Sequence, residues 1–75
     1  MSNPYANPIK VDPETAEQLP IDGIRLALFQ AKEAGQIEDW KYNPDGNGYF
    51  YIDMNGTGFE RYTPDHAATS VLTSL

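Results

Sequence analysis

The pattern of apolar and polar residues changes its period along the chain. Between Pro20 and Gly35, apolar residues recur at helical spacing and charged residues fall between them. This spacing predicts an amphipathic helix over residues 23–34, with Asp22 as its N-cap and Gly35 in the left-handed conformation that ends it. One face of this helix must be covered by another part of the chain.

Beyond this helix, apolar and polar residues alternate, which is typical of short strands. We expect three strands, over residues 38–42, 49–53 or 54, and 57–62. The loop at residues 43–48 is rich in Asn, Asp, Gly and Pro, all of which favour turns. The dipeptide Asn55-Gly56 is typical of a two-residue hairpin turn of type I′. The pattern therefore predicts an antiparallel meander.

The two ends of the chain differ in their local signals. Near the C-terminus, Thr63 and Pro64 predict the start of a final helix, because they supply a hydroxyl cap and a proline at the first helical position. Residues 1–20 contain four prolines, and we expect a mostly extended arm with about one or two helical turns at residues 12–17. Residues 21–75 are then an α+β domain of order α-β-β-β-α, with the three-stranded meander packed against two helices.

This order of elements, over residues 22–75, is similar to that of the double-stranded-RNA-binding domain. Membership of that family implies a basic start to the final helix, where it contacts phosphates. Here Asp65 and His66 stand at that place, and Arg61 is the nearest cation. The resemblance is one of topology, and RNA binding is not carried over from it.

Length and charge restrict the function. Seventy-five residues form one domain, and eleven acidic against five basic residues give a net charge of −6. This charge repels a phosphate backbone, so we expect no direct binding to nucleic acid. We expect a protein partner instead, and a basic partner would match the negative charge. The chain has neither a long apolar stretch nor the pattern of a signal peptide, so we expect a soluble cytoplasmic protein without membrane contact, either monomeric or homodimeric.

The usual signatures of enzymes are missing from the sequence. It has no cysteine, and its single histidine, His66, has no second histidine with which to hold zinc. There is no glycine-rich phosphate loop, and a chain of this size has little volume for a water-excluding pocket. We therefore expect a protein that is not an enzyme and uses no cofactor.

The turn at residues 55–56 predicts which residues share a face of the sheet. A two-residue turn places Ile52 opposite Phe59 and Tyr49 opposite Tyr62, and a compact loop at 43–48 places Trp40 opposite Tyr51. One face is then apolar and covered by the helices. The other carries an aromatic and acidic set: Trp40, Tyr42, Tyr49, Tyr51, Asp53, Glu60 and Tyr62.

This aromatic and acidic face is our leading candidate for a functional surface. Aromatic side chains with polar tips supply much of the binding energy at protein interfaces. The sequence thus predicts a small acidic interaction protein, an accessory factor or an inhibitor; in a narrower version, a phage or plasmid protein mimics the charge of nucleic acid. The opposite arrangement stays open, in which Trp40 lies beneath the helices and Lys41 and Arg61 mark the face in contact with water.

A calcium-binding module is the alternative function. Residues 43–50 resemble the first eight positions of the EF-hand calcium loop, with oxygen ligands at alternating positions and Gly48 at the sharp turn. The resemblance ends there, because Met54 stands at the place of the bidentate Glu, and strands replace the flanking helices. The candidate ligands are Asn43, Asp45, Asn47 and Asp53.

Overall fold

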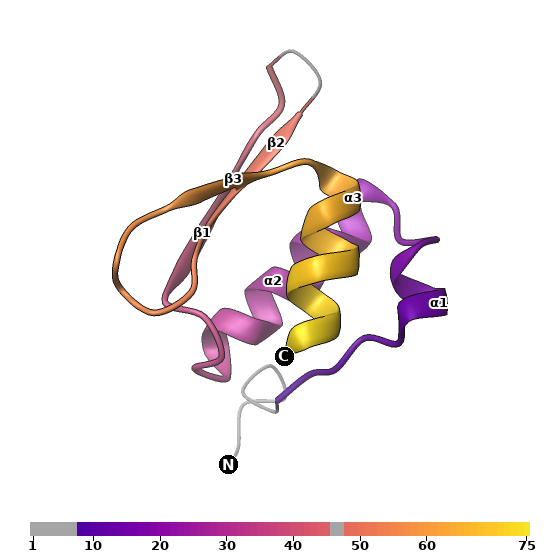
Figure 1. Ribbon diagram of the computed structural model, residues 1–75, viewed down its shortest axis with the longest axis horizontal. Helices are drawn as coiled ribbons and strands as arrows, with labels where there is room; N and C mark the ends of the chain where they lie inside the picture. The colour runs from indigo at the N-terminus through magenta and orange to yellow at the C-terminus, as the bar shows by residue number, and fades with distance from the viewer. Residues whose placement is uncertain (1–7, 46–47) are drawn as a thin grey trace.

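A three-stranded antiparallel sheet packed against helices forms the fold of the computed structural model, which describes residues 8–45 and 48–75. The strands β1 (Asp39–Asn43), β2 (Tyr49–Asp53) and β3 (Glu60–Tyr62) lie in that order across the sheet. Helix α2 (Ile21–Glu33) and the helical segment that follows β3 lie on the same side of the sheet (Figure 1). The predicted α+β class and the three-stranded meander are confirmed.

Helix α2 begins slightly earlier than predicted. Pro20, in an extended conformation, precedes its first residue, and Asp22 therefore lies inside the first turn and not at the cap. There its carboxylate lies 3.7 Å from the Arg25 guanidinium and close to the positive end of the helix dipole. Gly35, with a φ of 76°, ends the helix as predicted, because this left-handed conformation favours a residue without a Cβ.

The C-terminal helical segment begins where the sequence predicts and then departs from α-helical geometry. Helix α3 (Pro64–His66) starts at Pro64, and the Thr63 hydroxyl accepts a hydrogen bond of 3.3 Å from the His66 N–H. The chain continues as a π-helical stretch (Ala67–Val71) and a 3₁₀ turn (Leu72–Ser74). Hydroxyl groups of this segment donate to carbonyls four residues earlier, which competes with the backbone ladder and bends helices.

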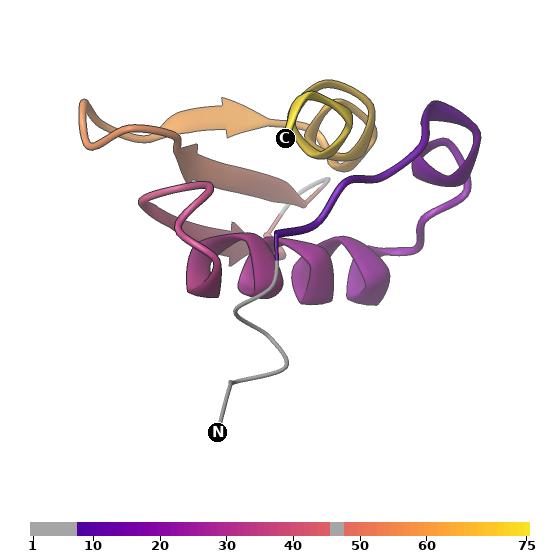
Figure 2. The ribbon, with the colours of Figure 1, turned by 90° about the horizontal axis from the view of Figure 1, so that it is seen from below.

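The core lies between the sheet on one side and helix α2 and the C-terminal helical segment on the other. Phe50 and Ile52 of β2 are fully buried, and they pack with residues of α2 and of the C-terminal helical segment. The buried apolar residues are Ala16, Ile24, Ala27, Leu28, Ala31, Ile37, Phe50, Ile52, Ala67, Ala68, Val71 and Leu72. Figure 2 shows α2 and the C-terminal segment at opposite edges of the sheet, where together they enclose this core.

The described part of the N-terminal arm also packs on the core. The predicted helical turn is present as α1 (Pro13–Ala16), and its Ala16 is buried. The backbone of Ile9 exchanges two hydrogen bonds with the side chain of Gln36, at 3.0 and 2.8 Å. The Val11 N–H donates a hydrogen bond of 3.5 Å to the Leu72 carbonyl, so the arm is tied both to Gln36 and to the C-terminal segment. Figure 2 shows the arm passing beside that segment.

Both strand pairings are shifted by one residue from the predicted ones. Trp40 lies opposite Ile52 instead of Tyr51, and Tyr62 lies opposite Phe50 instead of Tyr49. Because side chains alternate along a strand, a shift of one residue moves all of them to the other face of the sheet. Relative to β2, the residues of β1 and β3 have therefore exchanged faces, and the predicted composition of both faces is wrong.

The connection between β2 and β3 explains the shift at that pair. It spans residues 54–59 and is not the predicted two-residue turn of type I′, because Asn55 lacks the positive φ that such a turn needs. The Asp53 carboxylate accepts a hydrogen bond of 2.7 Å from the Gly56 N–H, and Gly56 and Gly58 have positive φ values. The side chain of Asp53 thus shapes the loop, and β3 is shorter than predicted.

Candidate protein-interaction surface

The side of the sheet turned away from the helices, here called the outer face, is built from all three strands. Lys41 of β1, Tyr51 of β2 and Arg61 of β3 are paired across the sheet, so their side chains project to the same side. Tyr49 lies on this side too, because it is two residues from Tyr51 along β2. Both basic residues are exposed and both tyrosines are half-buried. The outer face thus carries a tyrosine between two cations.

The two cations of the outer face lie over aromatic rings. The guanidinium carbon of Arg61 is 4.8 Å from the centre of the Tyr49 ring. The Lys41 ammonium is 4.7 Å from the ring centre of Phe59 and 5.8 Å from that of Tyr51. These distances are within the range of about 6 Å in which a ring attracts a cation electrostatically. Each cation is therefore held near the sheet while it stays exposed to solvent.

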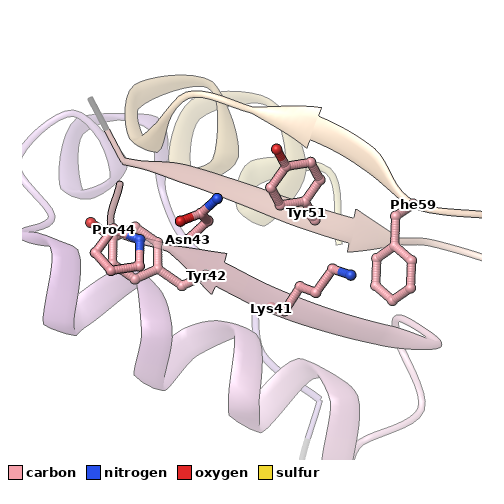
Figure 3. A pocket seen from close by; sticks show the side chains of 6 residues that line it. All are labelled: Lys41, Tyr42, Asn43, Pro44, Tyr51 and Phe59. Carbon is pink, nitrogen blue, oxygen red and sulfur yellow. The ribbon is translucent and has the colours of Figure 1, made fainter. Parts of the chain in front are cut away.

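A groove of about 420 Å³ lies beside this row of residues. Figure 3 shows Phe59 at one end, next to the tip of Lys41, and Pro44 at the other end. The volume is within the range of about 300–1,000 Å³ that is typical of ligand sites. Its lining residues are Lys41, Tyr42, Asn43, Pro44, Tyr51 and Phe59. The groove thus combines rings and a proline with amide and ammonium groups.

The exposed centre of the outer face is positively charged, although the net charge of the protein is −6. Among residues 8–45 and 48–75, no carboxylate lies within ion-pair distance of Lys41 or Arg61. The two aspartates that the register places on this side have other partners. Asp39 pairs with Lys32 of α2 at 3.0 Å, and Asp53 is only 8% exposed and binds the Gly56 N–H.

The Asp39 carboxylate stays ionised to lower pH than usual. Its hydrogen bond to the Lys32 ammonium is the main reason, and the N–H of Trp40 also donates to it at 2.8 Å. Both interactions stabilise the charged form and lower the pKa of Asp39. This aspartate therefore serves mainly the junction of α2 and β1, and the charge of Lys41 is the smallest of the influences on its pKa.

The structure divides the predicted aromatic surface between the two faces. Tyr49 and Tyr51 lie on the outer face, whereas Trp40, Tyr42 and Tyr62 are half-buried and pack against the core. The one-residue shift in register is the physical reason for this division. The grouping of these five residues on one exposed face was therefore wrong, and only the two half-buried tyrosines of β2 lie on the outer face.

The acidic members of the predicted surface also lie elsewhere. Glu60 is on the same side of β3 as Tyr62, where its carboxylate accepts a hydrogen bond of 2.9 Å from the Tyr62 hydroxyl. This bond is the main cause that raises the pKa of Tyr62, and burial adds to it. Asp53, the last residue of β2, is buried, and its carboxylate binds the Gly56 N–H of the β2–β3 connection. The exposed centre of the outer face is thus cationic and not acidic as predicted.

Three residues of the outer face, Lys41, Phe59 and Arg61, are absent from the predicted interaction set. The charge of Lys41 and Arg61 was the available signal, because a basic residue inside a strand is almost never buried without a partner. That signal favours the alternative arrangement considered above, with these two residues in contact with water. Phe59 carried no such signal, because an apolar ring that alternates with polar residues inside the predicted strand over residues 57–62 indicates a buried position.

The structure does not bring the candidate calcium ligands together. Asn43 and Asp45 are neighbours, and the Asn43 amide oxygen accepts a hydrogen bond of 3.0 Å from the Asp45 N–H. Asn47 lies outside the described residues. Asp53 is at the far end of β2, about 13 Å along the strand from the pair of Asn43 and Tyr49. In the described part of the chain, no group of three or more acidic or histidine side chains could hold a metal ion.

Comparisons with protein-family models, with curated proteins and with solved structures find no match to this chain. In the described ranges, no helix has the length and apolar character that crossing a membrane would need. The chemistry of the outer face is therefore the evidence from which a function can be argued.

Proposed function

We propose that this protein is a non-enzymatic interaction module, an accessory factor or an inhibitor, that binds a protein partner through the outer face. One observation carries this proposal. Tyr51 stands at the centre of the sheet side that no described helix covers, with Lys41 and Arg61 in register on either side and a groove beside it. Tyrosine and arginine are enriched among the residues that contribute most to binding at protein interfaces.

The outer face is already ordered before any partner arrives. Tyr51 and Tyr49 stand on the central strand, which is hydrogen-bonded on both sides, and basic groups contact both rings. A rigid tyrosine has only two side-chain torsions to lose on binding, so it adds contact area at a low cost in conformational entropy. The arrangement thus favours recognition of another molecule over chemical change of a substrate.

The test is affinity capture with chemical cross-linking, followed by mass spectrometry. Tyr51→Ala combined with Phe59→Ala removes the centre of the outer face and one end of the groove. Leu26→Ala is the matched control, because Leu26 is 52% exposed and lies on α2, on the other side of the sheet. Circular dichroism checks that both variants keep the fold.

We expect a partner that the wild type and the Leu26→Ala variant recover equally, and that the double variant recovers at least about tenfold less. Equal recovery by all three proteins rejects the outer face as the interface.

A further inference from the structure

On the basis of the proposed function, we infer that the outer face binds an extended acidic segment of the partner protein. Two carboxylates of this segment pair with Lys41 and Arg61, and neighbouring apolar residues lie against Tyr51 and in the groove. Charge, area and spacing on the outer face each support this assignment.

Charge complementarity indicates an acidic occupant. Lys41 and Arg61 are exposed and lie over aromatic rings, and neither forms an ion pair with a carboxylate among the described residues. Asp39 is hydrogen-bonded to Lys32 and interacts with the charge of Lys41 only weakly. An incoming carboxylate would form charge-assisted hydrogen bonds with them. The basic partner that the net charge suggests would meet two like charges at this surface, which disfavours the complex.

The area of the outer face indicates a segment and not a whole domain. Three strands at a spacing of about 4.8 Å, each five residues long or shorter, cover roughly 14 by 17 Å. The projected area is roughly 240 Å², and even roughly double that value, to allow for the relief of the side chains, stays below the 800 Å² or so of accessible surface that each partner contributes to a standard interface between domains. A short peptide segment, in contrast, fits a face of this size.

The spacing of the two cations indicates an extended segment with a defined pattern. Lys41 and Arg61 are on strands separated by β2, so their Cα atoms are about 10 Å apart. In a polyproline II chain, residues i and i+3 lie on the same side and about 9.3 Å apart. Such chains also dock on surfaces lined by aromatic residues. Carboxylates three positions apart, with proline or another apolar residue between them, match both features.

Rings beside cations would also suit a single-stranded nucleic acid, whose bases stack and whose phosphates pair. The net charge of −6 argues against this occupant, because every nucleotide adds a negative charge that the rest of the surface repels. A peptide with two carboxylates places its charge only where the two cations are. Nucleic acid is therefore an outcome to be tested and not the inference.

The experiment selects displayed random peptides of about 12 residues on the full chain, a length that covers the whole face in extended form. The charge-reversed variant, Lys41→Glu with Arg61→Glu, serves for counter-selection. The matched control reverses the charge elsewhere, with Lys10→Glu, Gln18→Glu and Ser70→Asp. These exposed residues lie in the N-terminal arm and the C-terminal segment, outside the outer face and the groove, and together they change the net charge by the same amount. Selected peptides and oligothymidylate are then titrated into all three proteins by NMR and by fluorescence anisotropy.

We expect the selected peptides to be enriched in Asp and Glu at i and i+3, and to bind the outer-face reversal at least about tenfold more weakly than the matched control. Their affinity should fall as salt rises. Neutral or basic peptides, no enriched peptide, or equal affinity for both reversals would overturn the inference. So would oligothymidylate binding that only the outer-face reversal abolishes.

These results can be separated from a failure of the proposed function. A partner whose capture needs Tyr51 and Phe59, but tolerates the outer-face reversal, leaves the proposed function intact and rejects the acidic segment. A partner that depends on neither pair rejects both.

Discussion

The two faces of the sheet use aromatic residues in different ways. On the covered face, rings pack on rings: the centres of Tyr42 and Phe50 are 4.6 Å apart, and those of Trp40 and Phe50 are 6.4 Å apart. On the outer face, the rings of Tyr49 and Tyr51 instead contact the basic groups of β3 and β1. The same residue type thus stabilises the core on one side and prepares a binding surface on the other, and its neighbours decide which.

The largest expected effect comes from removing the centre of the covered face. Phe50→Ala deletes a fully buried ring and should lower the free energy of unfolding by about 3–5 kcal/mol. Because a domain of this size has a net stability of only about 3–5 kcal/mol, the variant should be largely unfolded at 25 °C. Urea denaturation followed by circular dichroism measures this.

The adjacent residue on the outer face is the control. Tyr51→Ala should cost about 1 kcal/mol or less, because cross-strand contacts contribute on that scale and no core cavity is formed. Equal losses for the two variants would show that the faces do not differ as described.

The next largest effect concerns the loop that joins β2 to β3. Asp53→Ala removes the buried acceptor of the Gly56 N–H and should cost about 1–3 kcal/mol. Asp53→Asn retains an acceptor oxygen and should cost less than the alanine variant. Hydrogen exchange at the Gly56 amide should accelerate in the alanine variant, and unchanged protection there would contradict the role of this carboxylate.

A smaller effect is expected for the cations of the outer face. Arg61→Gln keeps a long side chain but loses the contact of the guanidinium with the Tyr49 ring. Exposed contacts of this kind contribute about 0.5–1 kcal/mol, so the melting temperature should fall by about 2–8 °C. Arg25→Gln is the matched control. In the wild type, the Arg25 guanidinium carbon lies 5.8 Å from the ring centre of Tyr42, at the covered face. A collapse of the fold in the first variant would mean that the outer face is structural.

The smallest effect is a pH dependence at the edge of the covered face. The hydrogen bond to Glu60 raises the pKa of Tyr62 above its unfolded value of 10.0. This contribution to stability is complete at neutral pH and is lost as the pH rises through the folded pKa. Ultraviolet titration of the phenol should show the pKa of Tyr62 fall in Glu60→Gln. No difference between the two proteins would show that this bond does not form in solution.

The sequence by itself determined the local elements of this protein. Gly35 terminates helix α2 because the chain needs a left-handed residue just beyond the last turn. The final helix begins at Pro64 because proline is suited to the first turn and Thr63 can cap it. The alternation predicted a strand from residue 49 to residue 53 or 54, and β2 ends at the first of these two positions. These features depend on neighbours along the chain, so the α+β class and the order of the strands followed from them.

Only the tertiary structure decided the register, and with it the composition of the outer face. Strand β2 carries Tyr49 and Tyr51 on one side and Phe50 and Ile52 on the other, so both sides offer aromatic surface to a neighbouring strand. A shift of β1 by one residue therefore changes the apolar pattern of the sheet little, although it places Lys41 instead of Trp40 beside Tyr51 on the outer face. The buried carboxylate of Asp53 and the packing of two helices against β2 settle this choice, and both depend on contacts that form only in the folded chain.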